Sequence, residues 1–164
     1  SVVFSGFSAL AFRDRVNDCE AKVVITCDGF WRRGKKVYLK QQADEALEDA
    51  PSVNNCIVVK RTGDGVPWNA GRDVWWNDIV FDSPKECETE KLDANDPLFF
   101  LYTSGTTGKP KGIVHAHGGY AVGTSYTLNW VFDMKDTDIW WCAADGGLAA
   151  DLYLLAGFQS SLSN

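Results

Sequence analysis

The chain has 164 residues, enough for one ordinary globular domain, and 45% of them are hydrophobic against 23% charged. This balance excludes a wholly disordered chain, and no apolar run reaches the roughly 20 residues that a membrane helix needs. A net charge of −6 argues against a nucleic-acid coat, and the five cysteines, without a C-x-x-C pair, argue against a disulfide scaffold or structural zinc site. We therefore expect a cytoplasmic protein with neither a nucleic-acid nor a membrane partner.

The first 60 residues alternate between β-prone runs and helical patterns. Ser8 is a suitable N-cap for a helix that runs to about Cys19, and its plausible buried positions are Leu10, Phe12, Val16 and Cys19. A charged helix is expected over residues 41–49, and strands are expected over residues 2–4, 23–26 and 56–59. The first two strands would close a βαβ unit. Continuous β-branched runs between helices predict an α/β fold, with a mostly parallel sheet flanked by helices.

The next part of the chain is less regular. Residues 62–71 predict a loop, 72–81 a short helix that buries some of its apolar side chains, and 82–97 a polar linker. A buried strand is expected over residues 98–102. It is followed by an expected strand over 113–115, a helix over 119–130 and a last strand over 139–142.

The most informative segment is the loop directly after the strand predicted over residues 98–102. Residues 103–112 carry four hydroxyl side chains, three glycines and two lysines. Glycines let backbone N–H groups approach phosphate oxygens, hydroxyls donate to them or bind Mg²⁺, and lysine supplies positive charge. It is not a Walker P-loop, because Pro110 follows Lys109 and blocks the helix that such a loop would open. The alternative to a phosphate-binding loop is a flexible surface turn without a ligand.

Residues 103–112 resemble the phosphate loop of the AMP-forming, adenylate-forming enzymes. Further segments resemble the acetyl-CoA synthetase family in order, namely residues 3–8, 24–29, 71–76, 117–120 and 141–145. The resemblance implies part of the large N-terminal AMP-binding domain, with ATP (as its Mg²⁺ complex), CoA and acetate as substrates. Acetate would form acetyl-adenylate and pyrophosphate, and CoA would then displace AMP. Another short carboxylate, such as propionate, stays open.

The same resemblance assigns roles to the loop residues. Those expected to bind the β- and γ-phosphates of ATP are Thr103, Ser104, Gly105, Thr106, Thr107, Gly108, Lys109 and Gly112. Lys111 is the expected catalytic residue, because it would neutralise charge on the departing pyrophosphate.

A second candidate site is a basic run with five Lys and Arg among residues 32–40. Taken alone, this run favours a solvated basic turn or a nucleic-acid patch. The family resemblance instead implies that it binds the phosphates of CoA, through Arg32, Arg33, Gly34 and Lys35.

His115 and His117 lie two residues apart without a third ligand nearby, so we expect structural roles for them and no metal site. The resemblance covers residues 1–145, whereas residues 146–164 form a tail that we expect to come from a shifted reading frame or a retained intron. We expect the chain to be part of a longer enzyme and catalytically incomplete alone. The alternative is a non-catalytic, truncated polypeptide that binds a nucleotide.

Overall fold

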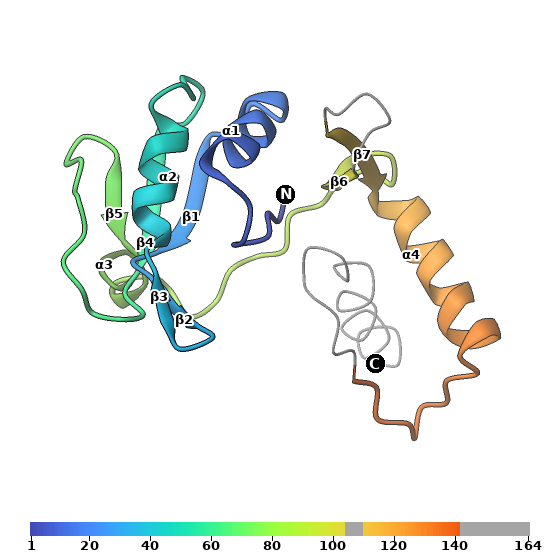
Figure 1. The fold of residues 1–164 in the computed structure, drawn as a ribbon. Helices are drawn as coiled ribbons and strands as arrows, with labels where there is room; N and C mark the ends of the chain where they lie inside the picture. The colour runs from blue at the N-terminus through green and yellow to red at the C-terminus, as the bar shows by residue number, and fades with distance from the viewer. Residues whose placement is uncertain (104–109, 142–164) are drawn as a thin grey trace. The chain divides into compact units, whose positions relative to one another are not determined.

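The computed structural model describes residues 1–103 and 110–141, and the chain divides into two compact units (Figure 1). The N-terminal unit comprises residues 5–89, and the C-terminal unit comprises residues 1–4 together with the chain from residue 90 onward. Within the described parts, no helix has the length and apolar character needed to cross a membrane.

The N-terminal unit is built on a three-stranded parallel sheet in the order β1-β4-β5, which confirms the predicted α/β class. The strands are β1 (Val23–Cys27), β4 (Asn55–Val59) and β5 (Asp73–Trp75). Ile25 pairs with Ile57, which in turn pairs with Val74. A separate antiparallel hairpin, β2 (Phe30–Arg32) and β3 (Lys35–Val37), follows β1.

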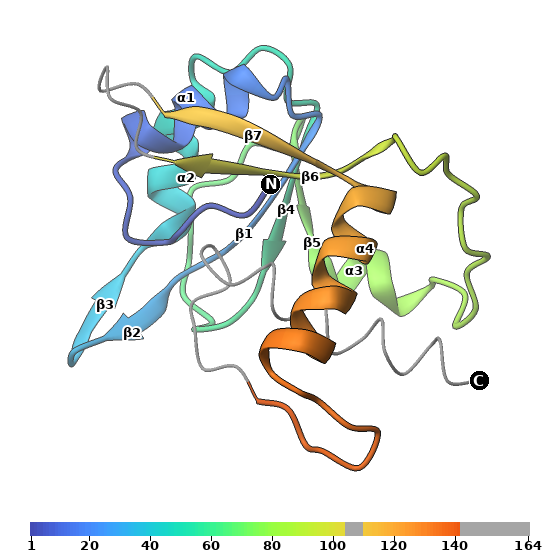
Figure 2. The same ribbon diagram turned by 90° about the vertical axis from the view of Figure 1, so that its right-hand side faces the viewer.

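Three helices accompany the sheet, namely α1 (Ala9–Asp18), α2 (Leu39–Leu47) and α3 (Trp76–Phe81) (Figure 2). α1 packs against α2, α2 contacts β1, and α3 contacts β4 and β5. The core between the helices and the sheet consists of Val16, Val24, Leu47, Ala50, Cys56 and Val58. These side chains come from α1, from α2 and the turn after it, and from β1 and β4, so their burial holds these two helices against the sheet.

α1 begins as the sequence predicts, because Ser8 is its N-cap and the Ala11 backbone N–H donates to the Ser8 hydroxyl at 3.2 Å. Val16 is buried as expected. The sequence also predicts that Leu10 is buried, but 56% of it is exposed, so the core-facing stripe of this helix is narrower than its sequence indicates.

Two elements of the N-terminal half differ from the sequence prediction. Residues 2–4 form no strand, so the predicted βαβ unit around α1 is wrong; the parallel crossover instead runs from β1 through α2 to β4. Residues 73–75 form β5 rather than the first turn of a helix. Pairing with β4 determines that conformation, and local sequence periodicity cannot reveal such a pairing.

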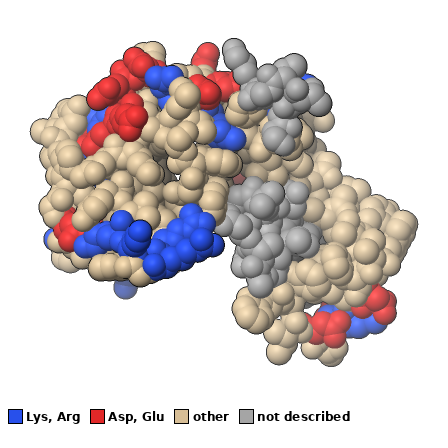
Figure 3. Space-filling model, in the orientation of Figure 1, with Lys and Arg blue, Asp and Glu red and all other residues tan. Residues whose placement is uncertain are grey.

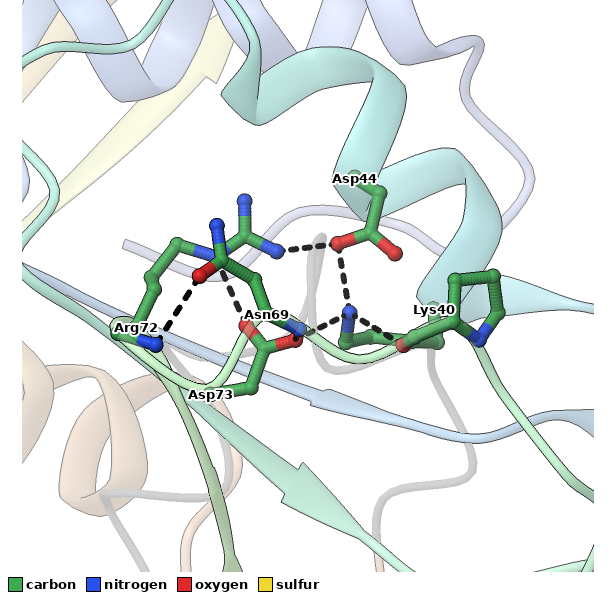
Figure 4. A network of polar contacts seen from close by, with 7 residues as sticks. Lys40, Asp44, Asn69, Arg72 and Asp73 are labelled. Carbon is green, nitrogen blue, oxygen red and sulfur yellow. Dashed lines mark hydrogen bonds and ion pairs between the residues drawn. The ribbon is translucent and has the colours of Figure 1, made fainter.

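A network of ion pairs joins α2 to β5 (Figure 4). The fully buried Lys40 ammonium lies 2.6 Å from Asp44 and 2.8 Å from the buried Asp73 carboxylate, and it donates to the Pro67 carbonyl at 3.2 Å. Arg72 contacts both carboxylates, with Nε 2.8 Å from Asp73. Two cations therefore face two anions, and each buried charge has a partner of opposite sign.

The C-terminal unit contains the antiparallel pair β6 (Pro97–Thr103) and β7 (Lys111–Ala116). α4 (His117–Tyr126) and the π-helix η1 (Thr127–Val131) follow directly. The strand expected over residues 98–102 is half-buried and antiparallel to its partner, not a buried strand of the parallel sheet. Residues 139–141 form no strand, and Ile139 is 98% exposed. Position 142 lies outside the described residues.

Replacing Lys40 by Met should lower the free energy of unfolding of the N-terminal unit by about 3–5 kcal/mol, because the buried Asp73 carboxylate would lose its ammonium partner. Hydrogen exchange of the β4 amides under increasing urea measures this loss unit by unit. The matched control is Arg13→Ala, which removes a surface ion pair with Asp49 at 2.8 Å and should cost at most about 1 kcal/mol. Equal losses in the two variants would contradict the prediction.

Candidate functional site

The two ends of the glycine-rich loop lie side by side. Thr103 at the end of β6 is the direct cross-strand partner of Lys111 at the start of β7, and Tyr102 pairs with Gly112. Side chains of directly opposite residues in an antiparallel pair project from the same face, with Cβ atoms about 4.5–5.5 Å apart. Thr103 and Lys111 are both exposed, and because they are paired their side chains lie together on one face at the root of the loop.

The remaining loop residues expected to bind ATP phosphates, Ser104, Gly105, Thr106, Thr107, Gly108 and Lys109, lie outside the described residues. The structure thus places Thr103, Lys111 and Gly112 of the predicted phosphate site. It also changes the setting of the loop. The sequence predicts that the loop follows a buried strand of a mostly parallel fold, whereas in the structure the loop connects two antiparallel strands.

His115 lies on β7 within a small aromatic cluster, away from the loop. Its ring stacks on Phe99 with centroids 4.5 Å apart, and Tyr120 meets Phe99 edge-on at 5.0 Å. This packing supports the expected structural role of His115. Among residues 1–103 and 110–141, no group of three or more His, Cys, Asp or Glu is placed to hold a metal ion.

Four of the five basic residues of the run lie in the β2–β3 hairpin, called the basic hairpin below, and the fifth, Lys40, lies in α2. Arg32 and Lys35 are cross-strand partners, so their side chains share one face, while Trp31 and Lys36 pair on the opposite face. Figure 3 shows Lys and Arg side chains gathered on the surface where this hairpin lies in Figure 1. Arg32, Arg33 and Lys35 are exposed.

A two-residue turn sets this arrangement. Arg33 and Gly34 both have positive φ, +50° and +75°, as a type I′ turn requires. Glycine adopts this conformation without strain, which explains Gly34 in the motif. The turn places the residue before it and the residue after it directly opposite each other.

Two basic residues of the run behave differently from the rest. Lys40, which sequence proximity groups with the basic run, is fully buried in the ion-pair network and contributes nothing to the exposed charge. Lys36 is held by an ion pair with Asp64, and its ammonium lies 5.2 Å from the centre of the Trp31 ring.

The carboxylate of Asp28 organises the base of the basic hairpin, and the sequence reading did not single it out. Asp28 is fully buried and accepts hydrogen bonds from the backbone N–H groups of Gly29 at 2.7 Å, Arg61 at 2.9 Å, Thr62 at 3.0 Å and Gly63 at 2.7 Å. Burial raises the pKa of this carboxyl, but the four N–H donors outweigh burial and hold the pKa at about 2. The Asp-Gly dipeptide after a strand is a turn signal that could have drawn attention to it.

Comparison with known proteins places this architecture in a family. Residues 1–159 match the AMP-binding enzyme family, and the chain belongs to that family. The acetyl-coenzyme A synthetase of Methanothrix thermoacetophila is 57% identical over 158 residues, which cover 96% of this chain and 24% of that protein. The acetyl-coenzyme A synthetase of Rubrobacter xylanophilus is 51% identical over the same shares.

A solved structure shows the same fold. The acetoacetyl-CoA synthetase from Streptomyces lividans superimposes with a TM-score of 0.77 at 28% identity, over 93% of this chain and 23% of that chain. The chain therefore spans about a quarter of the length of the relatives that it matches. The family match extends past Asp145 to residue 159, and the expected domain boundary at residue 145 stays a prediction.

Replacing Asp28 by Asn should cost roughly 2–4 kcal/mol at pH 7, because the amide NH₂ would face backbone donors. The pKa of Asp28 is lowered in the fold, so its stabilisation is complete above the unfolded-state value of about 4 and is lost as the pH falls towards 2. The difference in unfolding free energy between the parent chain and Asp28→Asn should therefore narrow as the pH falls from 7 to 2.5. Asp14→Asn, at an exposed position of α1, is the control, and a gap that does not narrow with acid would contradict the prediction.

Proposed function

We propose that this chain is the part of an AMP-forming acetate–CoA ligase that binds the triphosphate of ATP and the phosphates of CoA. The observation that carries the proposal is the 57% identity, over nearly the whole chain, to a protein named acetyl-coenzyme A synthetase. In the full-length enzyme, an acetate oxygen would attack the α-phosphorus of Mg·ATP and release pyrophosphate. The CoA thiol would then attack the acetyl carbon and release AMP and the thiol proton.

The ATP assignment is supported by the root of the glycine-rich loop. Thr103 contributes a hydroxyl donor and Lys111 a cation on the same face of the β6–β7 pair. As the P–O bond to pyrophosphate breaks, negative charge grows on the departing group. An ammonium already in position stabilises that charge without reorganisation, which makes Lys111 the catalytic candidate. Mg²⁺ would arrive with ATP as part of the substrate.

The CoA assignment is supported by the basic hairpin. Two cations placed directly opposite each other repel, and an anion bound between them would offset that repulsion. Arg32 and Lys35 form such a pair on one face. Arg32 can donate to a phosphate in a bidentate manner, whereas Lys35 supplies a point charge.

Lys111→Ala tests the ATP assignment. A chimaera, in which the matched residues of this chain replace their counterparts in the Methanothrix thermoacetophila relative, provides the full-length context. The variant should slow acetate-dependent ATP–pyrophosphate exchange at least about 100-fold, the scale of removing one transition-state donor. Lys135→Ala, an exposed cation paired with Asp133, is the control. An unchanged exchange rate in Lys111→Ala would remove this residue from the site.

Arg32→Ala and Lys35→Ala test the CoA assignment in the same chimaera. Each loses a charge-assisted contact, so KM for CoA should rise about 10-fold while ATP–pyrophosphate exchange stays unchanged, because adenylation precedes CoA binding. Steady-state kinetics with CoA as the varied substrate measure the effect. Lys22→Ala, which removes a basic residue outside the hairpin, is the control. An unaltered KM for CoA in both variants would refute the assignment.

A further inference from the structure

A chain of polar contacts ties the basic hairpin to the loop after β4. On the hairpin, the Lys36 ammonium forms an ion pair with the Asp64 carboxylate. The Thr62 hydroxyl donates to the same carboxylate oxygen at 2.8 Å. The side chain of Lys36 is only 19% exposed and that of Asp64 34% exposed, so this contact is partly shielded from water. Asp64 therefore joins two segments that are remote in sequence.

The loop that carries Asp64 is itself fixed. The buried Asp28 carboxylate accepts from three successive backbone N–H groups of this loop, on Arg61, Thr62 and Gly63. Asp64 is the next residue along the chain. It therefore projects from a segment whose backbone is anchored to the end of β1, and it offers Lys36 an anion at a defined position.

The base of the basic hairpin is fixed from the other side. A Cβ atom on Gly29 would lie 2.8 Å from the Val37 carbonyl oxygen, so the backbone approaches closely here and leaves no room for a side chain. Lys36 is adjacent to Val37 and precedes this contact by one residue. The hairpin is thus held at its base by the close backbone contact between Gly29 and Val37, and along β3 by the ion pair of Lys36 with Asp64.

We infer that Asp64 is a positioning residue for CoA: by holding Lys36, it fixes the orientation of the basic hairpin and of the Arg32–Lys35 pair on the opposite face. This inference rests on the proposed CoA role of the hairpin. Lys36 is adjacent to Lys35 and opposite Trp31, so a change in its position moves the strand that carries Lys35. The hydrogen bonds from Lys36 and Thr62 also lower the pKa of Asp64, because both donors stabilise its charged form.

Electrostatic attraction alone predicts that removing the Asp64 charge strengthens CoA binding, which is the opposite of what a positioning role predicts. Removing the Asp64 charge leaves the neighbourhood of the hairpin more positive, and long-range attraction alone would then favour the anionic CoA. A positioning role predicts weaker binding instead, because Arg32 and Lys35 lose their fixed geometry. The sign of the change in KM therefore separates the two effects.

The experiment measures steady-state kinetics of Asp64→Asn and Asp64→Glu in the chimaera. For Asp64→Asn we expect KM for CoA to rise about fivefold, with kcat and the KM values for ATP and acetate unchanged. Asp64→Glu keeps the charge and should restore part of the loss. Glu45→Gln removes the same charge at an exposed position of α2 and is the control. A KM for CoA that is unchanged or lower in Asp64→Asn would overturn the inference.

The Arg32→Ala and Lys35→Ala variants distinguish this failure from failure of the proposed function. If they raise KM for CoA and Asp64→Asn does not, the hairpin binds CoA and only the inference on Asp64 is wrong. If neither raises it, the CoA assignment fails and the inference fails with it. Thermal unfolding of each variant checks that the N-terminal unit stays folded, as expected for the half-exposed Asp64.

Discussion

The buried carboxylate of Asp28 is the constraint on which the N-terminal unit depends. A charged group without access to water is costly unless donors surround it, and four backbone N–H groups surround this one. These donors come from the turn after β1 and from the loop after β4. One side chain therefore joins the ends of two neighbouring parallel strands and fixes the loop from which Asp64 projects.

The ion-pair network around Lys40 constrains the same unit where α2 meets β5, through paired charges and not through backbone donors. Lys40 and Asp44 come from α2, Arg72 directly precedes β5 and Asp73 begins it, and the four groups balance one another in charge. Such a network stabilises one docking of a helix on a strand only when every member is present, because a lone buried charge has no compensation. β5 is only three residues long and forms few backbone hydrogen bonds with β4, so the ion pairs provide additional contacts that hold it in place.

Local signals in the sequence predicted much of this fold. The Ser8 cap, the β-branched runs of β1 and β4 and the charged pattern of α2 each act over a few residues, so the sequence was sufficient for them. β5 and the pairing of β6 with β7 depend on partners elsewhere in the chain, and sequence periodicity carries no information on partners. Lys40 shows the same limit at a single residue. It belongs to the basic run in the sequence, yet it lies on α2 and its ammonium contacts the Asp73 carboxylate.

The two-residue turn of the basic hairpin restricts how this segment can change in length. Side chains alternate between the two faces of a strand, so one inserted or deleted residue between Arg32 and Lys35 would move Lys35 to the face of Trp31 and separate the two charges. Substitutions at Arg33 leave the pairing intact when the new residue accepts positive φ, as glycine or asparagine does. Related chains should therefore vary in residue type at the position of Arg33 while keeping the length of this hairpin constant.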